Sequence, residues 1–109
     1  MRLYFLALAI LVGFVAKAQA HTAASGWTYD AACCSDRDCG VARIGHVVPT
    51  AEGWRIQLKP GDHHFFEGGL DMIVPYGDRR LRESQDTEFH ICLGRTGRLF
   101  CLYIPHMGG

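Results

Sequence analysis

The sequence predicts a small α+β domain that is mostly β, with a short N-terminal helical turn stapled by disulfides onto an antiparallel sheet and a C-terminal β-hairpin. Three observations lead to this prediction. Short runs rich in β-branched and aromatic residues alternate with turn residues after Gly40. Five cysteines occur in 109 residues, and residues 1–20 have the pattern of an export signal. The length allows only one core, so residues 21–109 are expected to form a single domain.

The first 20 residues are expected to be a signal peptide that is cleaved before His21. Met1-Arg2 is positively charged, the thirteen residues from Leu3 to Val15 are almost wholly apolar, and Ala18-Gln19-Ala20 has the small-x-small cleavage pattern. The apolar run spans about 20 Å as a helix, which is shorter than the roughly 30 Å hydrocarbon core of a bilayer. We therefore expect a periplasmic or secreted protein with no membrane anchor after cleavage.

The charge of the chain argues against a nucleic-acid partner. Eleven Lys and Arg residues balance eleven Asp and Glu residues, and removing Arg2 and Lys17 with the signal leaves nine basic against eleven acidic side chains. A nucleic-acid-binding domain needs a large positive field. No such field is expected here.

An N-terminal turn and three strands are expected before the hairpin. Asp30 is suited to cap a helical turn over residues 31–34, and Ser35-x-x-Asp38 repeats the capping pattern. Strands are predicted where β-branched or alternating apolar residues run up to a proline or glycine turn, at residues 41–48, 54–58 and 70–74. Residues 50–53 are expected to form a hairpin loop, and the polar run 78–87 a connection.

The clearest local pattern is the C-terminal hairpin. Two strand-like runs, residues 89–93 and 98–104, flank Gly94-Arg95-Thr96-Gly97. If Gly94 faces Gly97, then His90 lies opposite Cys101, and Cys92 lies opposite Leu99. Cys92 and Cys101 are then diagonal neighbours at the edge of disulfide reach.

In an oxidising compartment, four of the five cysteines are expected to form two disulfides. Fifteen arrangements satisfy that count, and a direct bond between the adjacent Cys33 and Cys34 is disfavoured by strain. Gly40 lets the chain reverse after Cys39. We predict that Cys39 and one member of the adjacent pair bridge to Cys92 and Cys101. The other member remains a thiol that can join two copies into a dimer.

Three segments together resemble a family of small exported, cysteine-containing bacterial proteins of the alphaproteobacterial type, whose function is uncharacterised. The pattern is Trp27-x-Tyr29-Asp30-x-x-Cys33-Cys34-Ser35-x-x-Asp38-Cys39, then Ser84-x-Asp86-x-x-Phe89-His90-x-Cys92, then Cys101-Leu102-Tyr103-x-Pro105. Relatives tend to have Ser-Pro-Asp-Gly where this chain has Ser84-Gln85-Asp86-Thr87. The resemblance implies a periplasmic or secreted location and brings no activity with it.

Two histidines are candidate metal ligands. Cleavage leaves His21 with an α-amine and an imidazole, which together with a second imidazole is the ligand set of a copper histidine brace. His90 is expected beside Cys92 and opposite Cys101, and as reduced thiols these residues could complete a zinc or copper(I) site. We expect a terminal histidine without ligand role at His21, and a half-buried structural histidine at His90. For His63-His64, a solvent-facing pair ahead of two core aromatics is expected rather than a metal loop.

No catalytic residue set emerges from the sequence. It contains no Gly-rich phosphate loop, zincin helix, Gly-x-Ser-x-Gly elbow or Cys-x-x-Cys motif. Arg79-Arg80-x-Arg82 is the densest positive patch and could grip a carboxylate or phosphate, although interleaved acidic residues are expected to cancel its field. We expect a non-enzymatic module that binds an envelope protein or cell-wall component, without a cofactor. The alternative is a periplasmic copper- or zinc-binding protein using His21 or His90 with the remaining thiol.

Overall fold

A computed structural model describes residues 22–35 and 38–106, so the predicted signal peptide and His21 lie outside the described residues. The described residues contain seven strands and no helix: β1 (Cys39–Val41), β2 (Val47–Pro49), β3 (Gly53–Leu58), β4 (Leu70–Pro75), β5 (Leu81–Glu83), β6 (His90–Leu93) and β7 (Leu99–Ile104). In this part of the chain, no helix has the length and apolar character needed to cross a membrane.

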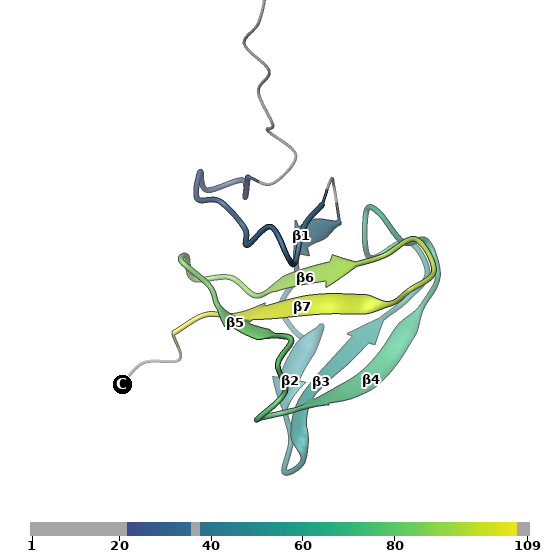
Figure 1. Ribbon diagram of the computed structural model, residues 1–109. Coiled ribbons are helices and arrows are strands. Elements are labelled where there is room, and N and C mark those ends of the chain that lie inside the picture. The colour runs from purple at the N-terminus through teal and green to yellow at the C-terminus, as the bar shows by residue number, and fades with distance from the viewer. Residues whose placement is uncertain (1–21, 36–37, 107–109) are drawn as a thin grey trace, which may run out of the picture.

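The strands form two sheets, as Figure 1 shows. One has four strands in the order β1-β6-β7-β5, and the other has three in the order β2-β3-β4. All neighbouring strands are antiparallel except β5 and β7, which are parallel. The N-terminal segment and the three-stranded sheet lie on opposite sides of the β6–β7 pair (Figure 1).

The two faces of β6 belong to different packing clusters, which is why all four of its residues are buried. Successive side chains of a strand point to opposite faces. Ile91 and Leu93 therefore pack with apolar residues of the three-stranded sheet, including Ile56 and Val74. His90 points to the other face, where Cys92 packs with the N-terminal segment.

Residues 22–35, together with Asp38, cover the second face and are called the N-terminal layer below. Disulfides join Cys33 to Cys101 and Cys39 to Cys92. Tyr29 and Tyr103 pack beside these bridges. The predicted pairing of Cys39 and one adjacent cysteine with the two hairpin cysteines is confirmed. Cys34 lies in neither disulfide, and its residue is only 1% exposed, so an intermolecular bond at Cys34 requires this layer to open.

The predicted N-terminal helical turn is not a helix. The Asp30 carboxylate accepts a hydrogen bond from Ala32 N, and its carbonyl accepts bonds from Cys33 N and Cys34 N. The turn goes no further as a helix, and the next described residues lead from Asp38 into β1. Asp30 therefore begins a single turn and caps no helix, and Cys33 in that turn is bonded to Cys101 of the sheet.

Two predicted elements between residues 41 and 87 are also corrected. The single strand expected over residues 41–48 is divided between β1 and β2, because the chain turns at Gly45 with a φ of 89°. The connection expected over 78–87 contains β5, whose three residues pair with Leu102–Ile104 of β7. Strands at 54–58 and 70–74 and the loop at 50–53 are confirmed by β3, β4 and the β2–β3 hairpin.

The C-terminal hairpin forms, but its predicted register is wrong by up to two residues. Leu93 pairs with Leu99, because Arg98 belongs to the loop and its carbonyl accepts a bond from Gly94 N. A β-bulge at Phe100 adds a second shift, so Cys92 lies opposite Cys101, and His90 lies opposite Tyr103. Gly97 has a φ of 86° and packs against Phe66, where a Cβ atom would lie 2.8 Å from the ring.

Candidate functional site

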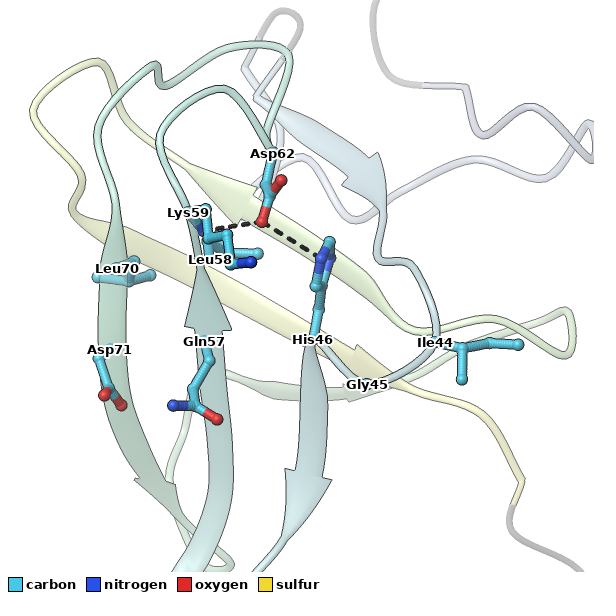
Figure 2. A pocket seen from close by; sticks show the side chains of 9 residues that line it. All are labelled: Ile44, Gly45, His46, Gln57, Leu58, Lys59, Asp62, Leu70 and Asp71. Atoms are coloured by element: carbon cyan, nitrogen blue, oxygen red, sulfur yellow. Dashed lines mark hydrogen bonds and ion pairs between the residues drawn. The ribbon is translucent and has the colours of Figure 1, made fainter.

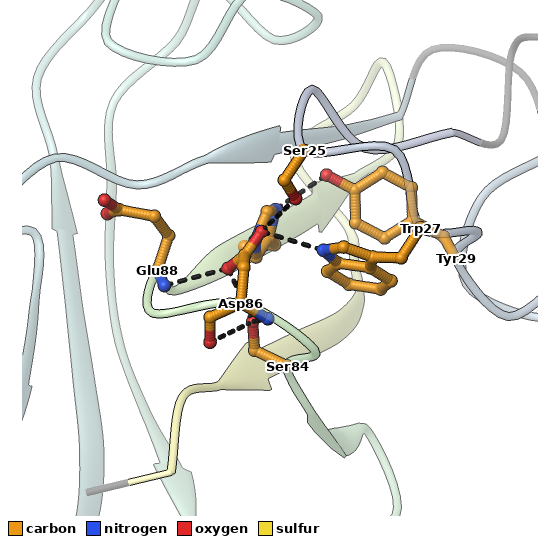
Figure 3. A network of polar contacts seen from close by, with 7 residues as sticks. Ser25, Trp27, Tyr29, Ser84, Asp86 and Glu88 are labelled. Atoms are coloured by element: carbon orange, nitrogen blue, oxygen red, sulfur yellow. Dashed lines mark hydrogen bonds and ion pairs between the residues drawn. The ribbon is translucent and has the colours of Figure 1, made fainter.

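Side-chain hydrogen bonds from Ser25 and Trp27 of the N-terminal layer converge on the Asp86 carboxylate, whose side chain is 17% exposed (Figure 3). Asp86 lies between β5 and β6, where its side chain accepts a bond from Glu88 N at 2.8 Å in an Asx-turn. Ser25 Oγ donates to Asp86 at 2.6 Å and Trp27 Nε1 at 2.8 Å, both from the N-terminal layer. Ser84 Oγ donates at 2.9 Å. We call these residues, with His90 and Tyr29, the Asp86 network.

The hydrogen bonds of this network keep Asp86 ionised. Burial acts to raise the pKa of the carboxyl group, but hydrogen bonds from Ser25, Trp27, His90 and the Glu88 amide outweigh burial and hold the pKa well below its usual range. A carboxylate with this many donors has little capacity left for a ligand. Asp86 therefore acts first as the attachment point of the N-terminal layer.

His90 connects Asp86 to Tyr29. Its Nε2 lies 2.8 Å from Asp86 Oδ1 and carries the hydrogen, because an ionised carboxylate only accepts. Its Nδ1 lies 2.7 Å from the Tyr29 hydroxyl. Burial raises the pKa of Tyr29, and nearby charges of Cys34, Asp86 and Tyr103 raise it further, so Tyr29 keeps its proton. The protonated hydroxyl can donate to Nδ1, so Tyr29, His90 and Asp86 form one hydrogen-bonded chain.

Hydroxyl, imidazole and carboxylate in this order resemble an acid–base triad, but here the set is enclosed. His90 is 0% exposed and Tyr29 is 5% exposed. Trp27 packs edge-on against both rings, with centroids 4.7 Å from Tyr29 and 4.9 Å from His90. A general base must come within hydrogen-bond reach of its substrate. Both groups are covered by Trp27 and the N-terminal layer, and their contacts attach that layer to the sheet.

The predicted ligand set of His90, Cys92 and Cys101 is not arranged as a metal site. Both sulfurs are in disulfides, and both ring nitrogens of His90 are hydrogen-bonded. Within residues 22–35 and 38–106, no group of three His, Cys, Asp or Glu side chains is placed to hold a metal ion. His21, the other candidate ligand, lies outside the described residues.

The predicted solvent-facing pair His63-His64 is only half correct. His63 is buried, its Nε2 donates to the Ile91 carbonyl at 2.9 Å, and its Nδ1 accepts from Phe65 N. Burial lowers the pKa of His63, although the bond to Ile91 opposes this effect. His64 is exposed and its ring stacks on His63. These contacts attach the loop after β3 to β6.

A pocket of about 500 Å³ opens beside β2 and β3 (Figure 2). Both carboxylates that line it already have partners. Asp62 accepts a bond from Lys59 N at 2.7 Å and lies 3.3 Å from His46 Nε2. Asp71 forms a bidentate pair with Arg55. The pocket therefore has few uncommitted groups with which to select a ligand.

A larger groove, of about 740 Å³, contains four arginines and is called the arginine groove below. Its lining comes from the β4–β5 turn, β5, the end of the hairpin loop, the start of β7 and the N-terminal layer: Ala32, Gly77, Asp78, Arg79, Arg80, Arg82, Arg98, Leu99 and Phe100. The topology explains the opening. β5 pairs only with Leu102–Ile104, so the start of β7 has no paired strand on the edge opposite β6, and the groove opens there beside the β4–β5 turn.

Two arginines of this groove are held by acids. Arg80 forms a bidentate pair with Asp78, at 2.9 and 2.8 Å, and bonds from its side chain and then its amide lower the pKa of Asp78 to about 2. Arg82 Nε lies 3.3 Å from Asp30 of the N-terminal layer, and its Nη1 donates to the carbonyls of Arg79 and Leu81. These contacts fix the orientation of both guanidinium groups.

The other two arginines, Arg79 and Arg98, form no ion pair within the part of the chain that the structure describes. No carboxylate there pairs with Arg79 or Arg98, and the Arg98 guanidinium lies over the Phe100 ring at 5.7 Å. The expected cancellation of the positive charge is incomplete, because the Asp86 carboxylate is hydrogen-bonded within the Asp86 network and Glu83 lines a different pocket. Arg98 is not part of the positive patch predicted from the sequence, because it is distant from Arg79 and Arg80 in sequence and lines the same groove only in the folded protein.

The residues that carry the family resemblance gather around the N-terminal layer. Trp27 and Ser84 bond to Asp86, Tyr29 bonds to His90, and Asp30 N donates to the Tyr103 hydroxyl at 2.8 Å. Comparisons of the chain with protein-family models, with curated proteins and with solved structures found no significant match. The resemblance therefore stays a prediction, and its residue pattern is explained by attachment of this layer.

Proposed function

We propose that the protein is an exported, non-enzymatic binding module of the bacterial envelope, whose ligand surface is the arginine groove. One observation carries this proposal. The only acid–base set near the candidate histidine is enclosed and saturated, whereas two arginines in an open groove have no acidic partner among the described residues. Binding rather than catalysis is what such an arrangement supports.

The disulfides support the exported location. Both bridges depend on an oxidising compartment, since cytosolic thiols are kept reduced. They also make the groove a rigid surface, because Cys33 is bonded to Cys101 and follows directly after the groove residue Ala32. A preorganised surface loses less entropy on binding.

Capture from envelope extracts tests this function. Immobilised oxidised protein is expected to retain an envelope component, and the double variant Arg79→Gln/Arg98→Gln is expected to lose it. Arg43→Gln, an exposed arginine outside the groove, serves as the matched control and should retain the component. Equal capture by all three proteins, or turnover of cell-wall substrates that Asp86→Asn abolishes, would contradict the proposal.

Copper or zinc binding is the alternative function, and it now rests on His21. The His90 nitrogens and the hairpin sulfurs are engaged in the contacts described above. Native mass spectrometry of protein recovered from the periplasm tests export and metal binding together. The proposal predicts a mature mass beginning at His21 with no metal retained after copper and zinc loading and chelator washing. Stoichiometric metal retention that is lost in His21→Ala would favour the alternative.

A further inference from the structure

We propose that the arginine groove recognises the phosphate monoester of a sugar or similar ring-bearing molecule. The inference rests on the proposed function and specifies the ligand class of the same groove. It begins from charge. Four guanidinium groups meet two carboxylates, those of Asp78 and Asp30, which leaves two positive charges in excess. A phosphate monoester carries about −1.5 to −2 at neutral pH, so it neutralises this excess.

The number of donors points to the same group. Arg79 and Arg98 each present a complete guanidinium fork, because no carboxylate among the described residues occupies either. Arg80 directs Nε and Nη2 to Asp78, and Arg82 directs Nε to Asp30 and Nη1 to carbonyls. One terminal nitrogen of each remains available. The three terminal oxygens of a phosphate monoester can accept bonds from two guanidinium forks and two single nitrogens, whereas the two oxygens of one carboxylate cannot.

The groove also has room and a wall for an organic group. Its volume of about 740 Å³ lies in the range of small-molecule sites and far exceeds one phosphate ion. The ring of Phe100 is half-buried, and the Arg98 guanidinium lies over it. An aromatic face beside a cationic site suits a sugar ring that carries the phosphate.

The site is held in place before a ligand arrives. Asp78 orients Arg80 from within the β4–β5 turn, and Asp30 orients Arg82 from the N-terminal layer. The layer itself is fixed by the bridge between Cys33 and Cys101. Planar guanidinium groups held in this way bind phosphate with less loss of conformational freedom than mobile lysines would.

Titration calorimetry with the full oxidised protein at low salt tests the inference. Glucose 1-phosphate is expected to bind, inorganic phosphate to bind more weakly, and glucuronate and glucose to bind at least about tenfold more weakly than the phosphate ester. Arg79→Gln and Arg98→Gln should each weaken glucose 1-phosphate binding about tenfold or more, while Arg43→Gln leaves it unchanged. Far-ultraviolet circular dichroism checks that each variant keeps its fold.

A second arm distinguishes a soluble ligand from a lipid headgroup. Phosphatidylcholine vesicles containing phosphatidic acid present the same monoester on a membrane, and vesicles containing phosphatidylglycerol present a diester. Arginine-dependent binding of glucose 1-phosphate alone assigns a soluble ligand, and binding of phosphatidic acid vesicles as well assigns a headgroup of the same chemistry. Equal affinity for glucuronate, or full affinity in the Arg79→Gln/Arg98→Gln variant, would overturn the inference. Arginine-dependent capture from extracts without phosphate binding would leave the proposed function standing and show that the ligand class is wrong.

Discussion

The two faces of the four-stranded sheet are covered by layers that are held in different ways. On one face, β2–β4 pack through apolar side chains, among them Ile56 and Val74, which are both 0% exposed. On the other face, the N-terminal layer is attached by the Cys33–Cys101 disulfide and by the Asp86 network, and the Cys39–Cys92 disulfide joins β1, which follows the layer, to β6. One layer is therefore stabilised by burial, and the other by covalent bonds and charge-assisted hydrogen bonds.

The difference follows from what each segment can bury. The three-stranded sheet forms its own hydrogen-bonded ladders and offers alternating apolar residues. The N-terminal layer has only the isolated bridge between Thr22 and Thr28, and it buries few apolar groups besides Ala23 and Tyr29. A segment with so little apolar surface cannot offset its own ordering entropy. The disulfides reduce that cost by restricting the unfolded chain.

Reduction of both disulfides is expected to have the largest effect. Closing the loop between Cys39 and Cys92, with a sequence separation of 53, is worth about 4 kcal/mol on the chain-entropy estimate. The second bridge, with a separation of 68, then adds a loop of only about 15 residues, worth about 3 kcal/mol. The sum is comparable with the whole stability of a small domain, about 5–15 kcal/mol. Urea unfolding with and without reductant measures this loss.

Cys34→Ala supplies the control for reduction. This variant keeps both bridges, so it should lower the free energy of unfolding by only about 1 kcal/mol. A reduced protein with an unchanged unfolding midpoint would mean that the bridges do not stabilise the fold.

The next effect concerns the apolar face. Ile56→Ala removes a fully buried side chain and should cost about 2–5 kcal/mol by loss of burial and creation of a cavity. Ile73→Ala on the neighbouring strand β4 is the matched control, because Ile73 is 42% exposed. It should cost less than about 1 kcal/mol. Similar costs at the two positions, measured by urea unfolding, would show that this face is not held by burial.

Asp86→Asn tests the polar attachment of the N-terminal layer. The amide loses the charge that Ser25, Trp27 and His90 bond to, which should cost about 1.5–3 kcal/mol. Trp27 should also become more exposed to solvent, which its fluorescence reports in a Trp54→Phe background, because Trp54 also emits. Asp71→Asn removes a carboxylate from an exposed pair with Arg55 and should leave both readouts nearly unchanged. A Trp27 emission that does not respond to Asp86→Asn would argue against this attachment.

The smallest expected effect is a pH dependence of stability, in which His63 and Asp86 contribute in different pH ranges. Burial lowers the pKa of His63 in the folded protein. As the pH drops, His63 therefore takes up its proton in the unfolded chain before it does so in the folded protein, and stability falls below the unfolded pKa of about 6.5. The pKa of Asp86 is also lowered, so its contribution is present above about pH 4 and is lost below. Between pH 7 and 5, stability should fall less steeply in His63→Gln than in the wild type. An identical slope in both proteins would contradict this assignment.

The sequence predicted those strands that are marked by the pattern of neighbouring residues along the chain. β3, β4 and the strands of the C-terminal hairpin follow from runs of alternating or β-branched residues ended by turns. β5 could not be predicted in this way. Its three residues contain one apolar side chain, Leu81, and form a strand only because β7 offers an edge. The break at Gly45 was readable in principle, since glycine permits the positive φ found there.

The disulfides were predicted correctly from a register that was wrong. The hairpin was expected to place Cys92 and Cys101 diagonally, whereas the bulge at Phe100 places them opposite each other. They still bridge to Cys33 of the N-terminal layer and to Cys39 at the start of β1. The arginine groove was only half predictable for the same reason. Arg79, Arg80 and Arg82 are adjacent in sequence, but Arg98 joins them through the tertiary packing of the hairpin.

Peptide mapping with two-stage alkylation tests the covalent attachment of the N-terminal layer most directly. The native protein is alkylated with one reagent, unfolded without reduction, alkylated with a second, and cleaved at arginines between the cysteines. The structure predicts Cys33 bonded to Cys101, Cys39 bonded to Cys92, and Cys34 carrying only the second reagent, because its residue is 1% exposed. Fragmentation between residues 33 and 34 distinguishes the adjacent pair. Recovery of Cys34 in a disulfide, or its labelling in the native protein, would contradict this account.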